Sequence, residues 1–298
     1  MSYPPPIKAV VAFEAVARHG SFGKAAEELN LTLSAVSHQI AALEDYVGRQ
    51  LFVRSPRGVT LTASGERYLQ SLSGALIMIA DARENARAEP GTEILRIHAA
   101  PSFASLWLMP RLAALKAVHP EIRVRLSASP GISDFSRGDI DADIRYGRAR
   151  WPNLHVESVF TEEIVPMASP NLRAQLNLQS PEDLLVHDLI LCEANLVQWP
   201  QWFAANGISM CPTQFALAFD RAHLSLDAAA QDLGIVLESE KLAERFLKNG
   251  TLVPVFPDRK SIAVHQHHLV YPPQHDDRNK VAKFAAWLRK EAAAKPAC

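Results

Sequence analysis

Hydrophobic residues recur at helical spacing along the first fifty residues of the chain. This pattern predicts one helix over residues 7–19, a second over 22–29, and a third that begins after Thr32 and ends at Gly48. In the third helix Val36, Ile40 and Leu43 fall on one face, so they form a buried stripe. The second and third helices are separated by a short turn. They are therefore expected to pack through their apolar sides and to leave the opposite side of the third helix free.

The free side of the third helix is small and polar at its N-terminal end, as suits a helix that enters the major groove of DNA. Residues 51–53 and 59–61 are predicted as two short strands, a β-wing whose basic turn suits phosphate or minor-groove contact. The residues predicted to contact DNA are Thr32, Ser34, Ala35, Ser37, His38, Gln39, Arg54 and Arg57. One alternative stays open here, namely a small helical bundle that only packs or dimerises.

The same stretch resembles the N-terminal signature of LysR-type transcriptional regulators. The matching residues, in order, are Phe13-Glu14-Ala15-Val16-Ala17, Ser21-Phe22, Ala25-Ala26, Ala35-Val36-Ser37-His38-Gln39-Ile40, Leu43-Glu44, Gly48, Leu51-Phe52 and Arg54. The run from Ala35 to Ile40 is most similar to the branch that holds the glycine-cleavage activator and the β-lactamase-gene regulator. The resemblance implies a DNA-binding regulator that works as a homodimer or homotetramer and contacts RNA polymerase.

A long helix is predicted from Thr62 to about Arg87, and the segment 89–92 is predicted as a linker. Such a helix, between two structural units, is interpreted as an antiparallel dimer seam; the alternative is a surface helix with a core-facing stripe. The expected domains are a winged helix-turn-helix at 6–63, a linker helix and hinge at 64–91, and a regulatory domain at 92–298.

After the linker the pattern changes to alternating strands and helices, which indicates an α/β unit. Strands are expected over 94–99, 122–128, 142–146, 189–192, 215–219, 234–237 and 264–271, and helices over 101–118, 134–138, 199–206, 224–233 and 278–294. The expected fold class is therefore α/β with an N-terminal all-α winged helix-turn-helix. The resemblance implies two lobes like those of periplasmic solute-binding proteins, lobe I at 92–161 and 267–298 and lobe II at 162–266.

In a two-lobed fold a ligand lies between the lobes, at the carboxyl ends of the strands. A serine at a helix start and two arginines would suit a carboxylate or an amino acid. The residues predicted to bind this effector are Ser102, Phe103, Ser129, Arg145, Tyr146, Asn195, Arg221 and His223. Two alternatives stay open: Ser102 only caps its helix, and Arg145 only pairs with Asp141 or Asp143.

Composition narrows the functional class. The net charge is −1, and residues 1–65 carry six basic and five acidic side chains, so few phosphates are neutralised per subunit and several subunits must bind together. No signal peptide or membrane span is recognisable, and a cytoplasmic protein with no membrane association is expected. No catalytic, phosphate-loop or dinucleotide motif is present, so neither enzymatic activity nor a cofactor is expected.

Two minor features stay outside this interpretation. The segment His265-Gln266-His267-His268 is rich in histidine, a common metal ligand, but no third ligand is evident nearby. It is therefore interpreted as a histidine cluster at the edge of a strand. Cys192, Cys211 and Cys298 form no CxxC pair, so unpaired thiols are expected. The alternative functions are a solute-binding protein or enzyme with an accessory helical head, and a regulator that senses redox state through Cys192 or Cys211.

Overall fold

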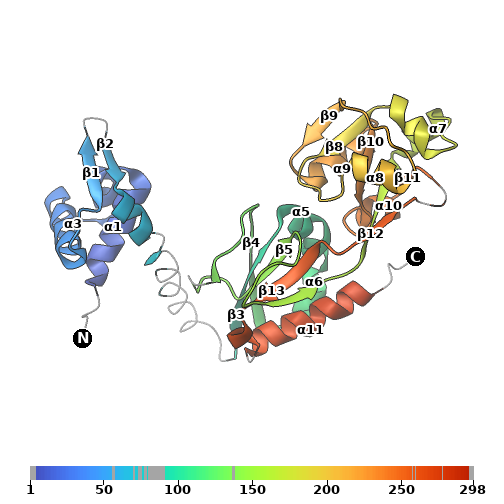
Figure 1. Ribbon diagram of the computed structural model, residues 1–298. Helices are drawn as coiled ribbons and strands as arrows, with labels where there is room; N and C mark the ends of the chain where they lie inside the picture. The colour runs from blue at the N-terminus through green and yellow to red at the C-terminus, as the bar shows by residue number, and fades with distance from the viewer. Residues whose placement is uncertain are drawn as a thin grey trace. The chain divides into compact units, whose positions relative to one another are not determined.

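The computed structural model describes residues 5–55, 58–69, 71–72, 76, 79, 91–135, 138–256, 258, 260–276 and 278–294. The chain divides into two compact units, residues 1–87 and, apart from 136–139, residues 88–298 (Figure 1). Within the described residues, no helix combines the length and the apolar character that crossing a membrane requires.

The first unit holds the three predicted helices, α1 (Ile7–His19), α2 (Phe22–Leu29) and α3 (Leu33–Val47). Local capping explains these boundaries. The Ser21 and Thr32 hydroxyls accept hydrogen bonds from the backbone N–H groups of Lys24 and Ala35 at 3.3 and 3.2 Å, which satisfies donors that the helices leave free. Asn30 and Gly48 then end α2 and α3 in the left-handed conformation.

The wing consists of β1 (Phe52–Ser55) and β2 (Gly58–Leu61), an antiparallel pair with Phe52 opposite Leu61. An aromatic cluster fixes the wing to the helices, because the Phe13 ring lies 5.2 Å from that of Phe52 and 5.5 Å from that of Tyr68. Tyr68 belongs to the next helix, so the wing is held between α1 and the start of the linker helix.

Of the predicted linker helix, residues 63–69, 71, 72, 76 and 79 are helical. The remainder, up to Arg87, lies outside the described residues. Thr62 begins it: the Thr62 N–H donates to the Leu51 carbonyl at 2.9 Å, and the Thr62 hydroxyl accepts from the Gly65 N–H at 3.0 Å. The Thr62 side chain therefore caps the start of this helix.

Gly65 lies against the backbone of the wing, and replacing it tests this junction. A Cβ atom added there would stand 2.2 Å from the Leu51 carbonyl oxygen. We expect Gly65→Ala to lower the free energy of unfolding of the first unit by about 1–3 kcal/mol, because the helix must shift away from the wing. Urea denaturation followed by circular dichroism measures it, with Gly23→Ala as control because its added Cβ meets no atom closer than 3.7 Å. Equal stability of the two variants would contradict the close packing.

The second unit begins with a five-stranded sheet, lobe I, in the order β4-β3-β5-β13-β6. Its strands are β3 (Glu93–Ala99), β4 (Ile122–Ala128), β5 (Ala142–Tyr146), β6 (His155–Ser158) and β13 (His267–Tyr271). Strand β3 is parallel to both β4 and β5, whereas β13 is antiparallel to β5 and β6. Helix α11 (Asn279–Ala293) lies along this sheet, and residues 273–275 form a short 3-10 turn before it (Figure 1).

The second sheet, lobe II, has the order β11-β7-β10-β8-β9, with β12 also paired to β7. Its strands are β7 (Glu162–Ala168), β8 (Leu189–Cys192), β9 (Leu217–Phe219), β10 (Ile235–Ser239), β11 (Val253–Pro254) and β12 (Ile262–Val264). Its helices are α7 (Pro170–Gln175), α8 (Trp199–Ala205), α9 (Ala222–Ala230) and α10 (Glu244–Lys248), with a 3-10 helix at Pro181–Val186. The chain passes between the lobes at 159–161 and again at 265–266.

Several expected elements differ from those observed. The helix expected over 101–118 is continuous through Pro110 but changes type along its length. It runs as α5 (Pro101–Phe103), a π-helix (Ala104–Leu108), a 3-10 turn (Met109–Arg111) and α6 (Leu112–Val118). The changes of helix type accommodate the missing proline N–H. In the piece expected at 134–138, only Phe135 among the described residues is helical. Helix α7 was not expected, although Ser169 caps it.

The strand expected over 264–271 is interrupted at the second passage between the lobes. His265 and Gln266 lie between β12 and β13, so His265 and His267 do not share one strand face. The interpretation of a strand-edge histidine cluster is wrong for His267 and His268, because β13 lies between β5 and β6 and both side chains are buried. Among the described residues no group of three or more potential metal ligands occurs.

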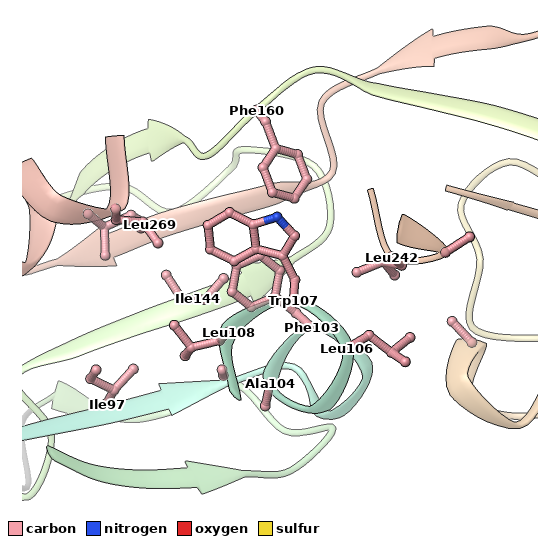
Figure 2. Close-up of a cluster of buried hydrophobic side chains, with 14 of the residues drawn as sticks. Ile97, Phe103, Ala104, Leu106, Trp107, Leu108, Ile144, Phe160, Leu242 and Leu269 are labelled. Atoms are coloured by element: carbon pink, nitrogen blue, oxygen red, sulfur yellow. The ribbon is translucent and has the colours of Figure 1, made fainter. Parts of the chain in front are cut away.

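A continuous hydrophobic cluster joins the two lobes. Figure 2 shows its centre, where Trp107 lies against Phe103 and Phe160, with ring centroids 5.1 and 5.3 Å apart. Leu106 from the π-helix of lobe I and Leu242 from lobe II belong to the same buried cluster. Lobe II also has a core of its own around Trp199, Trp202 and Phe203.

Candidate functional site

Helix α3 presents the polar face that the sequence predicts. Val36, Ile40 and Leu43 are buried, whereas Ser34 and His38 are exposed. The other predicted contacts on this face, partly or wholly exposed, are Thr32, Ala35, Ser37 and Gln39. The Thr32 hydroxyl is also engaged with the Ser34 hydroxyl at 3.0 Å, so it orders the start of the helix. A helix of this shape can place short polar side chains against base edges.

Of the two wing arginines, the structure describes only the backbone of Arg54. Arg54 lies in β1 opposite Val59, and its side chain lies outside what the structure describes. Arg57 as a whole lies outside the described residues. Their predicted contact with phosphate or the minor groove therefore stays a prediction.

A cavity of about 150 Å³ lies between the two lobes, at the carboxyl ends of β3, β4, β5 and β8. Six of the eight residues predicted to bind an effector line it: Ser102, Ser129, Arg145, Tyr146, Asn195 and Arg221. They come together because the ends of neighbouring parallel strands meet at one edge of each sheet, and these edges face each other across the cavity. Their role as effector ligands stays a prediction.

Ser102 and His223 link the two walls of the cavity. The Ser102 hydroxyl lies 3.2 Å from Nδ1 of His223 and accepts a hydrogen bond from the His223 N–H at 3.4 Å. Ser102 belongs to lobe I and His223 to the first turn of α9 in lobe II. His223 itself does not line the cavity, but it contacts Ser102, which does.

Phe103 does not reach the cavity. Its ring is fully buried and packs on Trp107, Phe160 and His267, at 5.1, 6.0 and 5.0 Å between centroids. In a helical segment each residue points about 100° away from the one before it, so Ser102 and Phe103 cannot share one wall. Phe103 therefore supports the cavity from behind.

Arg145 makes the ion pair that the sequence left open as an alternative. Its Nε donates to Asp143 Oδ2 at 2.9 Å and its Nη2 donates to the Ser133 carbonyl at 2.8 Å. Asp143 also lies 2.9 Å from Nδ1 of His98. Burial acts to raise the pKa of Asp143, but hydrogen bonds from His98, Ser133 and Arg145 outweigh it and hold the pKa below its usual value. The pair of charges is nevertheless part of the cavity wall.

Tyr146 and Asn195 bring buried polar groups to the lobe junction. The Tyr146 hydroxyl donates to Gln266 Oε1 at 2.6 Å and accepts from the Leu196 N–H of lobe II at 2.9 Å. Asn195 Nδ2 donates to Glu238 Oε2 at 2.9 Å. Burial raises the pKa of Glu238 to about 7, so this carboxyl changes charge near neutral pH.

The sequence missed three polar residues of the cavity wall: His98, Asp143 and His267. His98 uses both ring nitrogens within lobe I, because Nε2 lies 2.9 Å from the Ser129 hydroxyl. A signal did exist, since each of the three is a titratable residue inside a strand whose residues are mostly buried. Such a residue needs a partner and often marks a site.

The environments of Cys192 and Cys211 do not favour reactive thiols. Cys192 and Cys211 are free, and burial raises the pKa of Cys192 to about 12 and also raises that of Cys211. Thiolate is the reactive form, so a raised pKa makes both thiols slow to oxidise. Cys298 lies outside the described residues.

Two family models match the chain, one in each unit. The model of the bacterial regulatory helix-turn-helix protein, lysR family, matches residues 7–66, and that of the LysR substrate binding domain matches residues 88–293. The chain belongs to the LysR family. It is a LysR-type transcriptional regulator with an effector-binding domain, and the fold class and family that the sequence predicts are confirmed.

Relatives of this LysR-type regulator match nearly end to end. It is 39% identical over 287 residues to the HTH-type transcriptional regulator PerR of Escherichia coli (strain K12), covering 96% of this chain and 95% of PerR. It is 35% identical over 291 residues to the glycine cleavage system transcriptional activator of the same strain, covering 97% and 95%. These relatives are transcriptional regulators, which are not enzymes.

A solved structure matches the regulatory domain. The X-ray structure of the effector domain of the transcriptional regulator AmpR of Pseudomonas aeruginosa has a TM-score of 0.58 and 28% identity, covering 67% of this chain and 96% of that one. AmpR and the glycine-cleavage activator both belong to the branch that the sequence resembles. The accessory-head alternative, a solute-binding protein or enzyme, receives no support from these relatives.

Proposed function

We propose that this regulator binds an operator in double-stranded DNA through α3 and the wing, as a homodimer or homotetramer joined by the linker helix. Residues 6–63 would be the DNA-binding domain, 64–91 the linker and 92–298 the regulatory domain. The low charge of the first 65 residues supports binding by several subunits at once, because each contributes few phosphate contacts. It acts in the cytoplasm, where the DNA and RNA polymerase are.

The effector in this proposal is a small carboxylate or amino acid held between the lobes. The observation that carries it is the cavity of about 150 Å³, lined by Ser102 and Arg145 from lobe I and by Asn195 and Arg221 from lobe II. A cavity of this volume holds a molecule of about the size of benzene. An occupant that touches both lobes binds one arrangement of them better than another, and so shifts their equilibrium.

A gel shift on the DNA upstream of the regulator's own gene tests this function. We expect a discrete complex whose mobility or affinity changes with one member of a panel of small carboxylates and amino acids. A solute-binding protein with an accessory head would give no discrete complex with any DNA.

His38 is the largest polar side chain on the exposed face of α3, so its removal tests the recognition helix. We expect His38→Ala to weaken binding to the operator by about 1–3 kcal/mol through the loss of a base contact. Binding to non-specific DNA and dimerisation should not change, because Val36, Ile40 and Leu43 hold the helix in place. Footprinting titration measures the affinity, and an unchanged operator affinity would contradict the assignment of α3 to the groove.

A further inference from the structure

Two leucines at the start of α3 are exposed to solvent. Leu31 lies in the turn between α2 and α3 and is 45% exposed, and Leu33 is the first residue of α3 and is 56% exposed. Neither belongs to the hydrophobic core that the described residues of the first unit form, although α3 contributes Val36, Ile40 and Leu43 to that core. Single exposed leucines are common on protein surfaces, but two within three residues make a small apolar patch beside a polar face.

The polar side chains of the same turn are bonded close to the backbone. The Thr32 hydroxyl accepts a hydrogen bond from the Ala35 N–H at 3.2 Å and lies 3.0 Å from the Ser34 hydroxyl. Leu33, between these two short groups, has the longest side chain of the first turn of α3. In a helix that enters the major groove, the residues at its N-terminal end contact the base edges. Leu33 stands at that end, and it offers a base an apolar surface.

The major groove gives a leucine one preferred contact. The base edges there present hydrogen-bond donors and acceptors, and the apolar substituent among them is the C5-methyl group of thymine. A leucine placed over a donor or an acceptor would remove water from that group without replacing its hydrogen bond. A leucine placed against the thymine methyl group removes apolar surface of both partners from water. The side chain of Leu33 therefore favours thymine over the other three bases.

We propose that Leu33 is a specificity-determining residue, which contacts the C5-methyl group of a thymine in the operator. This inference rests on the proposed placement of α3 in the major groove. It adds the identity of one operator base and the residue that reads it. It is separate from the base contact proposed for His38, because recognition of a methyl group involves no hydrogen-bond donor.

Uracil in place of thymine tests this contact, because the two bases differ only by the methyl group. The DNA upstream of the regulator's own gene is amplified once with deoxythymidine triphosphate and once with deoxyuridine triphosphate. Gel-shift titration with the full-length protein at one salt concentration then gives the affinity for each DNA. We expect the parent protein to bind the uracil DNA about three- to tenfold more weakly, as the burial of one or two methyl groups implies.

The outcomes for the parent protein separate the two proposals. Equal affinity for thymine DNA and uracil DNA would overturn the methyl contact and leave the regulator function standing. The absence of a discrete complex with thymine DNA would count against the proposed function itself.

Leu33→Ala distinguishes a base contact from a structural role. Alanine favours the helix, and the leucine side chain that it replaces is exposed, so the first unit should keep its fold. On thymine DNA we expect this variant to bind about three- to tenfold more weakly than the parent. On uracil DNA it should bind like the parent, because the methyl group that Leu33 contacts is already absent. An equal loss on both DNAs would assign Leu33 to the fold or to subunit pairing and would overturn the proposal.

Ile7→Ala is the matched control. Ile7 is also the first residue of a helix in this unit and is 61% exposed, but it belongs to α1 rather than to α3. Its variant should keep the parent's preference for thymine DNA, and so should Leu33→Met, which retains an apolar side chain. Selection of binding sites from random DNA then locates the base: Leu33→Ala should lose the preference for thymine at one position of each half-site. A loss of preference at every position, or the same loss in Ile7→Ala, would contradict the assignment of Leu33.

Discussion

Replacing Asp143 with alanine is expected to lower the free energy of unfolding of the regulatory domain by about 3–5 kcal/mol. Asp143 is buried and is the shared partner of His98, Ser133 and Arg145. Its removal leaves the Arg145 guanidinium buried without this counter-charge; among the described residues it keeps a hydrogen bond to the Ser133 carbonyl and lies over the Phe135 and Trp151 rings. A buried charge without a partner lowers the free energy of unfolding far more than the loss of an exposed ion pair does.

Tryptophan fluorescence during urea denaturation measures this effect in the intact protein. All five tryptophans lie beyond residue 88, so the signal comes from the regulatory domain. Asp258→Ala is the control, because its ion pair with Lys260 is exposed and should contribute less than about 1 kcal/mol. A loss of under 1 kcal/mol for Asp143→Ala would show that Arg145 is not dependent on this partner. The same reasoning makes Arg145→Ala unsuitable as a pure test of effector binding.

Arg221→Ala is expected to raise the effector concentration needed for a response by about 10–100-fold, the size of a lost charged hydrogen bond. Arg221 lines the cavity from lobe II, and its only ion pair given by the described residues is with Asp220, which is well exposed. The substitution should therefore leave the fold and the affinity for DNA intact. Ser102→Ala should act in the same direction, because it removes a cavity hydroxyl and the link to His223.

Fluorescence anisotropy of labelled operator DNA, titrated with the effector identified by gel shift, measures both variants. Arg245→Ala is the control, since Arg245 lies in the same lobe, is about half exposed and does not line the cavity. A response midpoint for Arg221→Ala equal to that of Arg245→Ala would place the effector elsewhere.

The DNA-binding unit could be predicted nearly residue by residue, because its determinants are local. Ser21, Thr32 and Gly48 start or stop helices through bonds to residues three or four positions away. The stripe of Val36, Ile40 and Leu43 is visible from helical spacing alone. The strand ends of the regulatory domain were predictable for a similar reason, since alternating patterns and turns mark them.

The polar wall of the cavity was only partly predictable, because its pairs are distant in sequence. His98 meets Asp143 across 45 positions, and His267 meets Glu162 across 105. Nothing in the local pattern selects Asp143 over Asp141 as the partner of Arg145. Asp141 instead accepts from Arg278 and Lys280, which lie near the end of the chain. The π-helix at Ala104–Leu108 was equally invisible, because it depends on packing rather than on a residue signal.

The position of β13 in the lobe I sheet has a consequence for the order in which the protein is completed on the ribosome. β5 and β6 are made early, but the strand that lies between them is made only after the whole of lobe II. At synthesis rates of about 5–20 residues per second, the intervening stretch of roughly a hundred residues takes several seconds. During that time the helix-turn-helix head and then lobe II can fold, while the lobe I sheet stays in two pieces. The emergence of β13 closes that sheet and places His267 against Glu162, so the cavity between the lobes is among the last features of the nascent chain to form.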